Sequence, residues 1–155
     1  AFDMNVIAWS QNLTDERAAE VGVTRVSKQE LLERSDVASI HLVLSERTQH
    51  LIGAEDLAAM KPTAYLVNTS RGPIVDEDAL VEALRANTIA GAGLDVFGIE
   101  PLPADHPFRS LANTVLTPHV GYVTHETYET FYGDGVDAIR NYLAGTAVNV
   151  LNATY

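Results

Sequence analysis

The chain has 155 residues, of which 46% are apolar and 20% charged; its formal net charge is −11, and it contains no cysteine. This balance is typical of one globular domain with a substantial core. The lack of cysteine excludes disulfides and thiolate metal sites. No apolar run approaches the ~20 residues of a membrane span. Nucleic-acid binding needs clustered Lys and Arg, which the charge argues against. We therefore expect a cytoplasmic protein that binds no metal, membrane or nucleic acid.

Short apolar runs rich in β-formers alternate with helical patterns along the chain. Strands are predicted at residues 4–9, 23–26, 37–42, 64–67, 90–97 and 114–116. Helices are predicted at residues 14–21, 27–34, 55–60, 76–86 and 124–143. This alternation indicates βαβ units, hence an α/β fold with a mostly parallel sheet and helices on both faces.

Several helix boundaries have a clear chemical signal. Ser27 and Glu30 have the spacing of a capping box, and Asp76 can cap the helix that follows it. Pro62 ends one helix, and Gly145 follows the last. The remaining residues, 146–155, are expected to form an extended tail.

Three side chains that suit acid–base chemistry follow predicted strands: Arg71, Glu100 and His119. In open parallel sheets, ligands bind beyond the carboxyl ends of the strands. Arg can hold the carboxylate of a 2-keto acid and polarise its carbonyl, since it stays charged and binds bidentately. His can supply the proton, and a neighbouring carboxylate can fix its tautomer. Taken singly, each residue has an ordinary surface role, such as Arg71 pairing with Asp76 or Glu77; their convergence on one rim favours a catalytic site.

Three segments carry a family resemblance: VNTSRGPIVDE at residues 67–77, AGLDVF with EPLP at residues 92–103, and LTPHVG at residues 116–121. In this order they resemble the signature series of the D-isomer-specific 2-hydroxyacid dehydrogenases. The resemblance implies an oxidoreductase that moves a hydride between NAD or NADP and a small 2-keto or D-2-hydroxy acid, such as glyoxylate or hydroxypyruvate. It also implies a homodimer.

The resemblance assigns roles to individual residues. Arg71 binds the substrate carboxylate and carbonyl, His119 donates and accepts the proton, and Glu100 pairs with His119. The residues implied to contact the cofactor are Ser10, Leu42, Val43, Thr48, Thr69, Ser70, Arg71, Asp95, His119 and Gly121.

The Gly-rich fingerprint G-x-G-x-x-G of this family is absent. The chain therefore resembles an incomplete dinucleotide-binding domain at residues 1–145, a partial Rossmann-type sheet that lacks its first βα unit. The extended tail at residues 146–155 would return toward the missing substrate domain. Without that unit, the strands predicted at residues 4–9 and 37–42 lose their shared neighbour and leave unpaired edges. We expect a piece of a longer parent, inactive by itself, or a gap that a partner copy fills.

Two questions stay open at the level of sequence. Ser10 stands where NAD-preferring members carry an acidic residue, yet neither Gln11 nor Asn12 is an Arg that would attract a 2′-phosphate. Arg17 and Arg25 are distant in sequence, so NAD and NADP remain alternatives. A dinucleotide-sensing, corepressor-like binding protein of the same fold is the alternative function.

Overall fold

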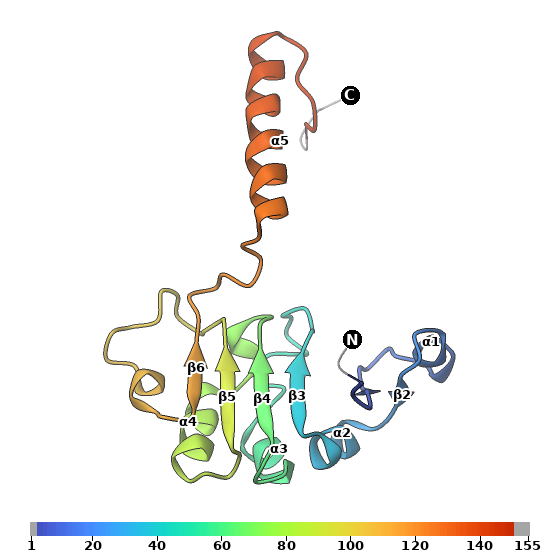
Figure 1. The fold of residues 1–155 in the computed structure, drawn as a ribbon, viewed down its shortest axis with the longest axis vertical. Coiled ribbons are helices and arrows are strands. Elements are labelled where there is room, and N and C mark those ends of the chain that lie inside the picture. The colour runs from blue at the N-terminus through green and yellow to red at the C-terminus, as the bar shows by residue number, and fades with distance from the viewer. Residues whose placement is uncertain (1–2, 151–155) are drawn as a thin grey trace. The chain divides into compact units, whose positions relative to one another are not determined.

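Strands and helices alternate through most of the computed structural model, which describes residues 3–150 (Figure 1). The described strands are β1 (Ile7–Ala8), β2 (Thr24–Arg25), β3 (Val37–Ile40), β4 (Tyr65–Asn68), β5 (Gly91–Leu94) and β6 (Thr114–Leu116). The described helices are α1 (Asp15–Glu20), α2 (Lys28–Arg34), α3 (Ala54–Ala59), α4 (Glu77–Arg85) and α5 (His125–Leu143), with short 3-10 turns η1 (Gly72–Ile74) and η2 (Pro107–Ser110). The predicted α/β class is confirmed.

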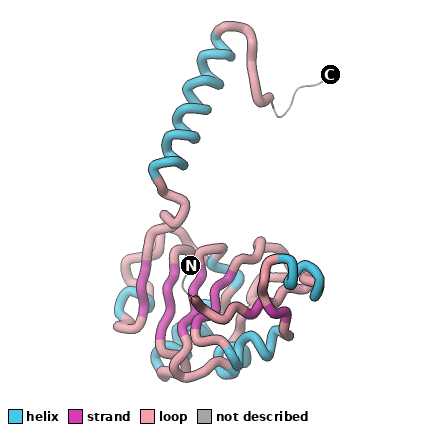
Figure 2. Tube along the Cα trace, turned by 45° about the vertical axis from the view of Figure 1, so that its right-hand side comes forward, coloured by secondary structure: helices cyan, strands magenta, loops and turns pink. Residues whose placement is uncertain are grey.

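The chain divides into two compact units, Ala1–His119 and Val120–Tyr155. In the first unit, β3, β4, β5 and β6 form a parallel four-stranded sheet in sequential order. Figure 2 shows these strands side by side. Ile40 pairs with Asn68, and Asn68 pairs with Leu94, so these strands end at the same level. Loops that leave these ends therefore start from a common rim.

The β1 and β2 strands form a separate parallel pair. As predicted, β1 and β3 do not pair with each other. A cavity of about 420 Å³ lies between them, and its lining includes Ile7 and Trp9 on one side and Ala38 and Ile40 on the other. The prediction of a strand over residues 4–9 was too long, because β1 spans only Ile7–Ala8 and pairs with a β2 that is itself two residues long.

The two faces of the four-stranded sheet differ in burial. Alternate residues such as Ala38, Leu66 and Leu94 are at most 5% exposed, whereas Val37 and Tyr65 on the other face are exposed. The α3 and α4 helices lie behind the strands in Figure 1, and α2 contacts α3. Together they cover the buried face with apolar side chains. These side chains include Leu32, Leu57, Leu80 and Leu84.

Local chemistry fixes the ends of these helices. The capping box at Ser27 and Glu30 forms as predicted, and the Asp76 carboxylate accepts a hydrogen bond from the Ala79 amide at 3.1 Å. The ammonium of Lys28 on α2 lies 2.8 Å from the Asp56 carboxylate on α3. This ion pair ties the two helices together beneath the sheet.

The second unit contains α5, capped at Thr124 and followed by Gly145 at a φ of 76°. No residue of α5 is buried. The ring centroids of Tyr128 and Tyr132 lie 5.2 Å apart on its surface, with the rings tilted by 47°. Within the described residues, no helix combines the length and apolarity needed to span a bilayer. Residues 151–155 of the predicted tail lie outside the described residues.

Candidate active site

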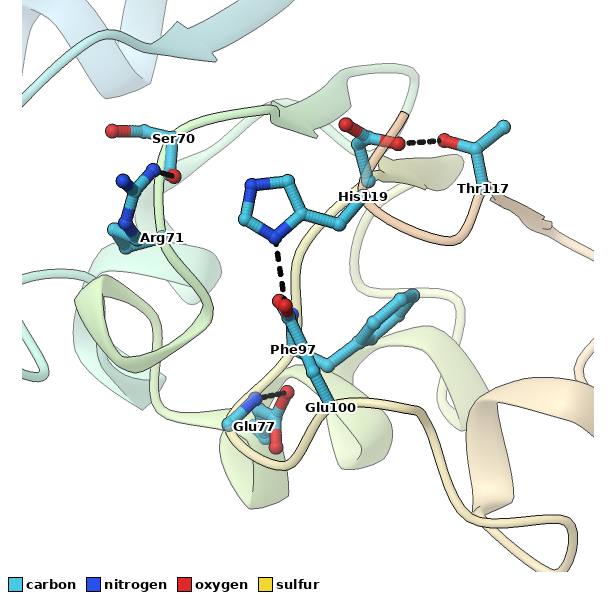
Figure 3. A network of polar contacts seen from close by, with 9 residues as sticks. Ser70, Arg71, Glu77, Phe97, Glu100, Thr117 and His119 are labelled. Atoms are coloured by element: carbon cyan, nitrogen blue, oxygen red, sulfur yellow. Dashed lines mark hydrogen bonds and ion pairs between the residues drawn. The ribbon is translucent and has the colours of Figure 1, made fainter. Parts of the chain in front are cut away.

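The carboxyl ends of β4, β5 and β6 bring the predicted catalytic residues to one corner of the first unit. Arg71 follows β4, Glu100 lies in the loop after β5, and His119 follows β6. The aligned strand ends explain why residues far apart in sequence meet here. Figure 3 shows the imidazole of His119 above Glu100, with Arg71 to one side.

Glu100 and His119 form a direct pair. The Nδ1 atom of His119 lies 2.7 Å from Oε2 of Glu100, and each side chain is about one-third exposed, 34% for His119 and 35% for Glu100. The other carboxylate oxygen of Glu100 accepts a hydrogen bond from the Phe97 amide at 2.9 Å. Glu100 therefore contacts the Nδ1 side of the ring, and a carboxylate in this position orients an imidazole and fixes which nitrogen carries the proton.

The pKa of Glu100 is lowered from the ordinary value of a glutamate carboxyl. Burial is the largest single cause and raises this pKa, whereas the hydrogen bonds from His119 and from the Phe97 amide lower it. The positive charges of His119 and Arg71 lower it further. Glu100 is therefore an anion across the physiological range, suited to holding a protonated imidazole.

The backbone of His119 lies in the left-handed region, with a φ of 56°. This conformation is uncommon for a residue with a side chain and concentrates at functional sites. The surrounding contacts of His119 with Glu100 therefore hold a conformation that the isolated chain disfavours.

The loop that carries Glu100 is anchored from the neighbouring α4 helix. The Glu77 carboxylate accepts a hydrogen bond from the Gly98 amide at 2.8 Å, as Figure 3 shows. Gly72 packs against the same loop so closely that an added Cβ would lie 2.1 Å from the carbonyl carbon of Phe97. Because Gly72 directly follows Arg71, this contact joins the Arg71 loop to the Glu100 loop.

The Arg71 loop is shaped by Asn68, which is 1% exposed. The amide of Asn68 donates to the Arg71 carbonyl at 2.9 Å, and its oxygen accepts from the Ser70 amide at 3.0 Å. The Ser70 hydroxyl donates to the Leu42 carbonyl. The guanidinium of Arg71 is exposed and donates to the Ser70 carbonyl at 2.6 Å, so most of its donors face outward.

The predicted catalytic residues line two separate cavities of the first unit. Glu100 and His119 line one of about 560 Å³, together with the apolar side chains of Phe97 and Leu116. Arg71 lines another of about 420 Å³. The geometry thus places a fixed cation and an acid–base pair in separate hollows of the same corner.

Most of the predicted cofactor residues line cavities along the strand ends. Leu42, Val43, Thr69 and Ser70 share the cavity of Arg71. Ser10, Leu42, Val43 and Thr48 share a further cavity of about 260 Å³ beyond β1 and β3. Leu42 and Val43 border both, so the two cavities adjoin.

Two residues predicted to contact the cofactor, Asp95 and Gly121, line neither of these two cavities. Asp95 is 4% exposed, and its carboxylate accepts a hydrogen bond from the Thr117 hydroxyl. Gly121 belongs to the second unit. Its contact with a cofactor stays a prediction.

Sequence reasoning gave no site role to Asn68 or Arg47, and it named Glu77 only as a possible partner of Arg71. Asn68 could have been found as a polar residue at the end of a buried strand. Glu77 and Arg47 act on Gly98 and Gln11, which lie 21 and 36 residues away. No local sequence pattern signals such contacts.

A parallel sheet with polar loops at its carboxyl ends defines the first unit as a Rossmann-type domain. The model of one family, the D-isomer specific 2-hydroxyacid dehydrogenase, NAD binding domain, matches residues 1–121. The chain belongs to this family.

Curated relatives are similar over most of this chain. It is 48% identical over 126 residues to a glyoxylate reductase of Korarchaeum cryptofilum, a match that covers 81% of this chain and 38% of the relative. It is 44% identical over 145 residues to glyoxylate/hydroxypyruvate reductase B of Yersinia pestis, covering 94% of this chain and 44% of that protein. The chain therefore spans less than half the length of these relatives.

Solved structures are also similar to this chain over most of its length. A Ralstonia solanacearum oxidoreductase, assigned as a D-3-phosphoglycerate dehydrogenase, is 41% identical with a TM-score of 0.87, covering 96% of this chain and 44% of that one. A D-lactate dehydrogenase of Aquifex aeolicus, complexed with NAD and lactic acid, is 32% identical with a TM-score of 0.76, covering 92% and 47%. An acyclic imino acid reductase in complex with NADPH and D-Arg is 35% identical with a TM-score of 0.74, covering 97% and 47%.

Proposed function

We propose that the whole protein containing this chain is an oxidoreductase that interconverts a small 2-keto acid and a D-2-hydroxy acid with NAD(H) or NADP(H). The observation that carries the proposal is the Glu100–His119 pair at 2.7 Å beside the exposed cation of Arg71. The names of the relatives, glyoxylate reductase and glyoxylate/hydroxypyruvate reductase B, favour glyoxylate or hydroxypyruvate as substrate.

The cavities at the strand ends fit a dinucleotide. Two adjoining cavities follow β3 and β4, and their described linings contain no carboxylate that would repel phosphate groups. Ser10, Val43 and Thr48 would hold the adenosine end, while Thr69 and Ser70 lie toward Arg71. When bound, the nicotinamide supplies or accepts the hydride.

The side chains of this chain handle the substrate and the proton. Arg71 directs several N–H donors outward, which suits a carboxylate and an adjacent carbonyl oxygen. His119 gives its proton to the carbonyl oxygen during reduction and takes it back during oxidation. Glu100 stabilises the positive imidazole and, through Nδ1, orients Nε2.

Steady-state kinetics on the whole protein tests this proposal, with a panel of 2-keto acids and both NADH and NADPH. We expect His119→Gln to lower kcat/KM by about 10²- to 10⁴-fold, because a general acid contributes that much. Arg71→Ala should lower kcat/KM comparably and raise KM. His125→Ala and Arg85→Ala, which replace exposed residues, serve as controls.

Full activity in His119→Gln would contradict the assignment of the acid–base residue. A protein that binds dinucleotide but reduces no keto acid would instead favour the corepressor-like alternative. Kinetic assays and dinucleotide-binding measurements on the same purified proteins distinguish these outcomes.

We further infer a cytoplasmic homodimer. The family resemblance and the cysteine-free composition support this inference. Sedimentation equilibrium of the whole protein tests it, and a monomer mass at micromolar concentration would contradict the dimer.

A further inference from the structure

Arg47 lies at the carboxyl end of β1, although it belongs to the loop that follows β3. Its guanidinium donates a hydrogen bond from Nη1 to the side-chain oxygen of Gln11 at 3.1 Å. Both residues line the cavity of about 260 Å³ that also contains Ser10 and Thr48. Among the described residues of this lining, Arg47 alone carries a charge.

The loop that presents Arg47 is closed by its own hydrogen bonds. The Thr48 hydroxyl donates to the Val43 carbonyl at 2.8 Å and accepts from the Ser45 amide at 2.8 Å. These bonds hold the segment on both sides of Arg47. The position of the guanidinium therefore does not depend on Gln11 alone.

The other candidate cations do not serve this cavity. Arg25 pairs with Asp15 at 3.5 Å, and neither Arg25 nor Arg17 lines the cavity. Arg47 has no carboxylate partner among the described residues, since its hydrogen-bond acceptor is the neutral amide of Gln11. Its positive charge is therefore available to an anion.

In dinucleotide-binding sheets, an acidic residue after the second strand binds the ribose 2′-hydroxyl of NAD, whereas a nearby Arg accommodates the 2′-phosphate of NADP. In this chain Ser10 lies two residues after β1, and its hydroxyl can donate to a phosphate and does not repel it. A cation and a hydroxyl thus border the same cavity where an NAD-preferring site would hold a carboxylate.

We propose that Arg47 and Ser10 form a subsite for the ribose 2′-phosphate of NADP(H), so that this chain prefers NADP(H) to NAD(H). The inference rests on the proposed dinucleotide binding and decides between its two cofactors. On binding, the 2′-phosphate replaces Gln11 as the acceptor of the Arg47 guanidinium and gains a bidentate, charge-assisted contact.

The test uses Trp9, the single tryptophan of the 155 residues, which lines the same cavity. Its fluorescence is followed while adenosine 5′-monophosphate, adenosine 2′,5′-bisphosphate or inorganic phosphate is added at constant ionic strength. We expect the bisphosphate to bind about tenfold more tightly than the monophosphate, the factor that one charge-assisted contact supplies. Inorganic phosphate should cause no saturable change.

Arg47→Gln should remove this tenfold difference and leave the affinity for the monophosphate unchanged. Arg85→Gln, which changes an exposed arginine on α4, is the matched control and should preserve the difference. Circular dichroism confirms that both variants are folded.

Equal affinities for the two nucleotides in the unchanged protein would overturn the inference and leave dinucleotide binding intact. A saturable response to inorganic phosphate equal to that of the bisphosphate would also overturn it. Binding of neither nucleotide would overturn the proposed dinucleotide binding, and the subsite with it.

Discussion

The two sheets of the first unit are built from the same kind of βα repeat, but they differ in burial. In the four-stranded sheet, Leu66 and Leu94 are at most 4% exposed, and two helices pack directly beneath the strands. In the two-stranded sheet, β1 is only partly buried and β2 is exposed along its length. Pairing alone does not explain the difference, because β3 also pairs on one edge only, yet it spans four residues and buries Ala38 and Ile40 in the core.

The two proposed sites differ in the same way. The proposed acid–base site is built on loops of the four-stranded sheet and is held by Asn68, Gly72 and Glu77. The proposed nucleotide site joins loops of both sheets through the exposed contact between Arg47 and Gln11. We therefore expect the first site to keep its geometry without ligand and the second to be ordered more by its ligand.

The largest expected contrast is in stability. Leu66→Ala should lower the free energy of unfolding by about 2–5 kcal/mol, because it leaves a cavity in a close-packed core. Ile7→Ala in β1 should cost about 1 kcal/mol or less, because that side chain is already partly exposed. Urea denaturation followed by circular dichroism measures both. Equal losses would show that the two sheets are equally packed.

A smaller loss of stability is expected where the Arg71 loop meets the Glu100 loop. Gly72→Ala should cost about 1–3 kcal/mol, since its Cβ would overlap the backbone of Phe97. Gly53→Ala is the control, because nothing lies within 4 Å of its added Cβ, and it should cost about 0.5 kcal/mol from the poorer N-cap of α3 alone. The same denaturation series compares them. A Gly72→Ala variant as stable as the Gly53→Ala variant would contradict the close packing.

The smallest expected effect is on the pKa values of two carboxyl groups, Glu100 near the four-stranded sheet and Glu16 near the two-stranded sheet. The pKa of Glu100 is lowered although burial raises it, because the hydrogen bonds from His119 and Phe97 and the charges of His119 and Arg71 together outweigh burial. The pKa of Glu16 on α1 is lowered by its own amide and by the Thr14 side chain. In carbon NMR titrations, both midpoints should fall below about 4.3, the ordinary value for a glutamate.

The lowered pKa values of Glu100 and Glu16 make the stability of the fold depend on pH. Each carboxylate contributes stability that is present above the pKa of the unfolded chain and is lost as pH falls through the lower pKa of the folded state. His119→Ala should raise the midpoint of Glu100 alone, and Thr14→Ala that of Glu16 alone. A variant that moved both midpoints would contradict the separate causes.

Sequence patterns predicted the local parts of this fold well. The bounds of β6 agree with the prediction, and the caps at Ser27 and Asp76 form as expected, because the atoms involved lie within a few residues. The order of the strand ends also placed Arg71, Glu100 and His119 on a common rim. The extent of β1 was overpredicted, since it depends on ladder partners that composition does not reveal. The contacts of Glu77 and Arg47 span 21 and 36 residues and arise only from packing.

The charge of Arg71 lowers the pKa of Glu100, and this has a consequence for proton balance. If, as proposed, a substrate carboxylate binds Arg71, it offsets the positive charge that stabilises the Glu100 anion. We then expect the pKa of Glu100 to rise, so that binding of an anionic substrate near that pKa is accompanied by uptake of a fraction of a proton. The substrate affinity should therefore depend on pH in acidic solution, and calorimetric binding enthalpies should vary with the ionisation enthalpy of the buffer.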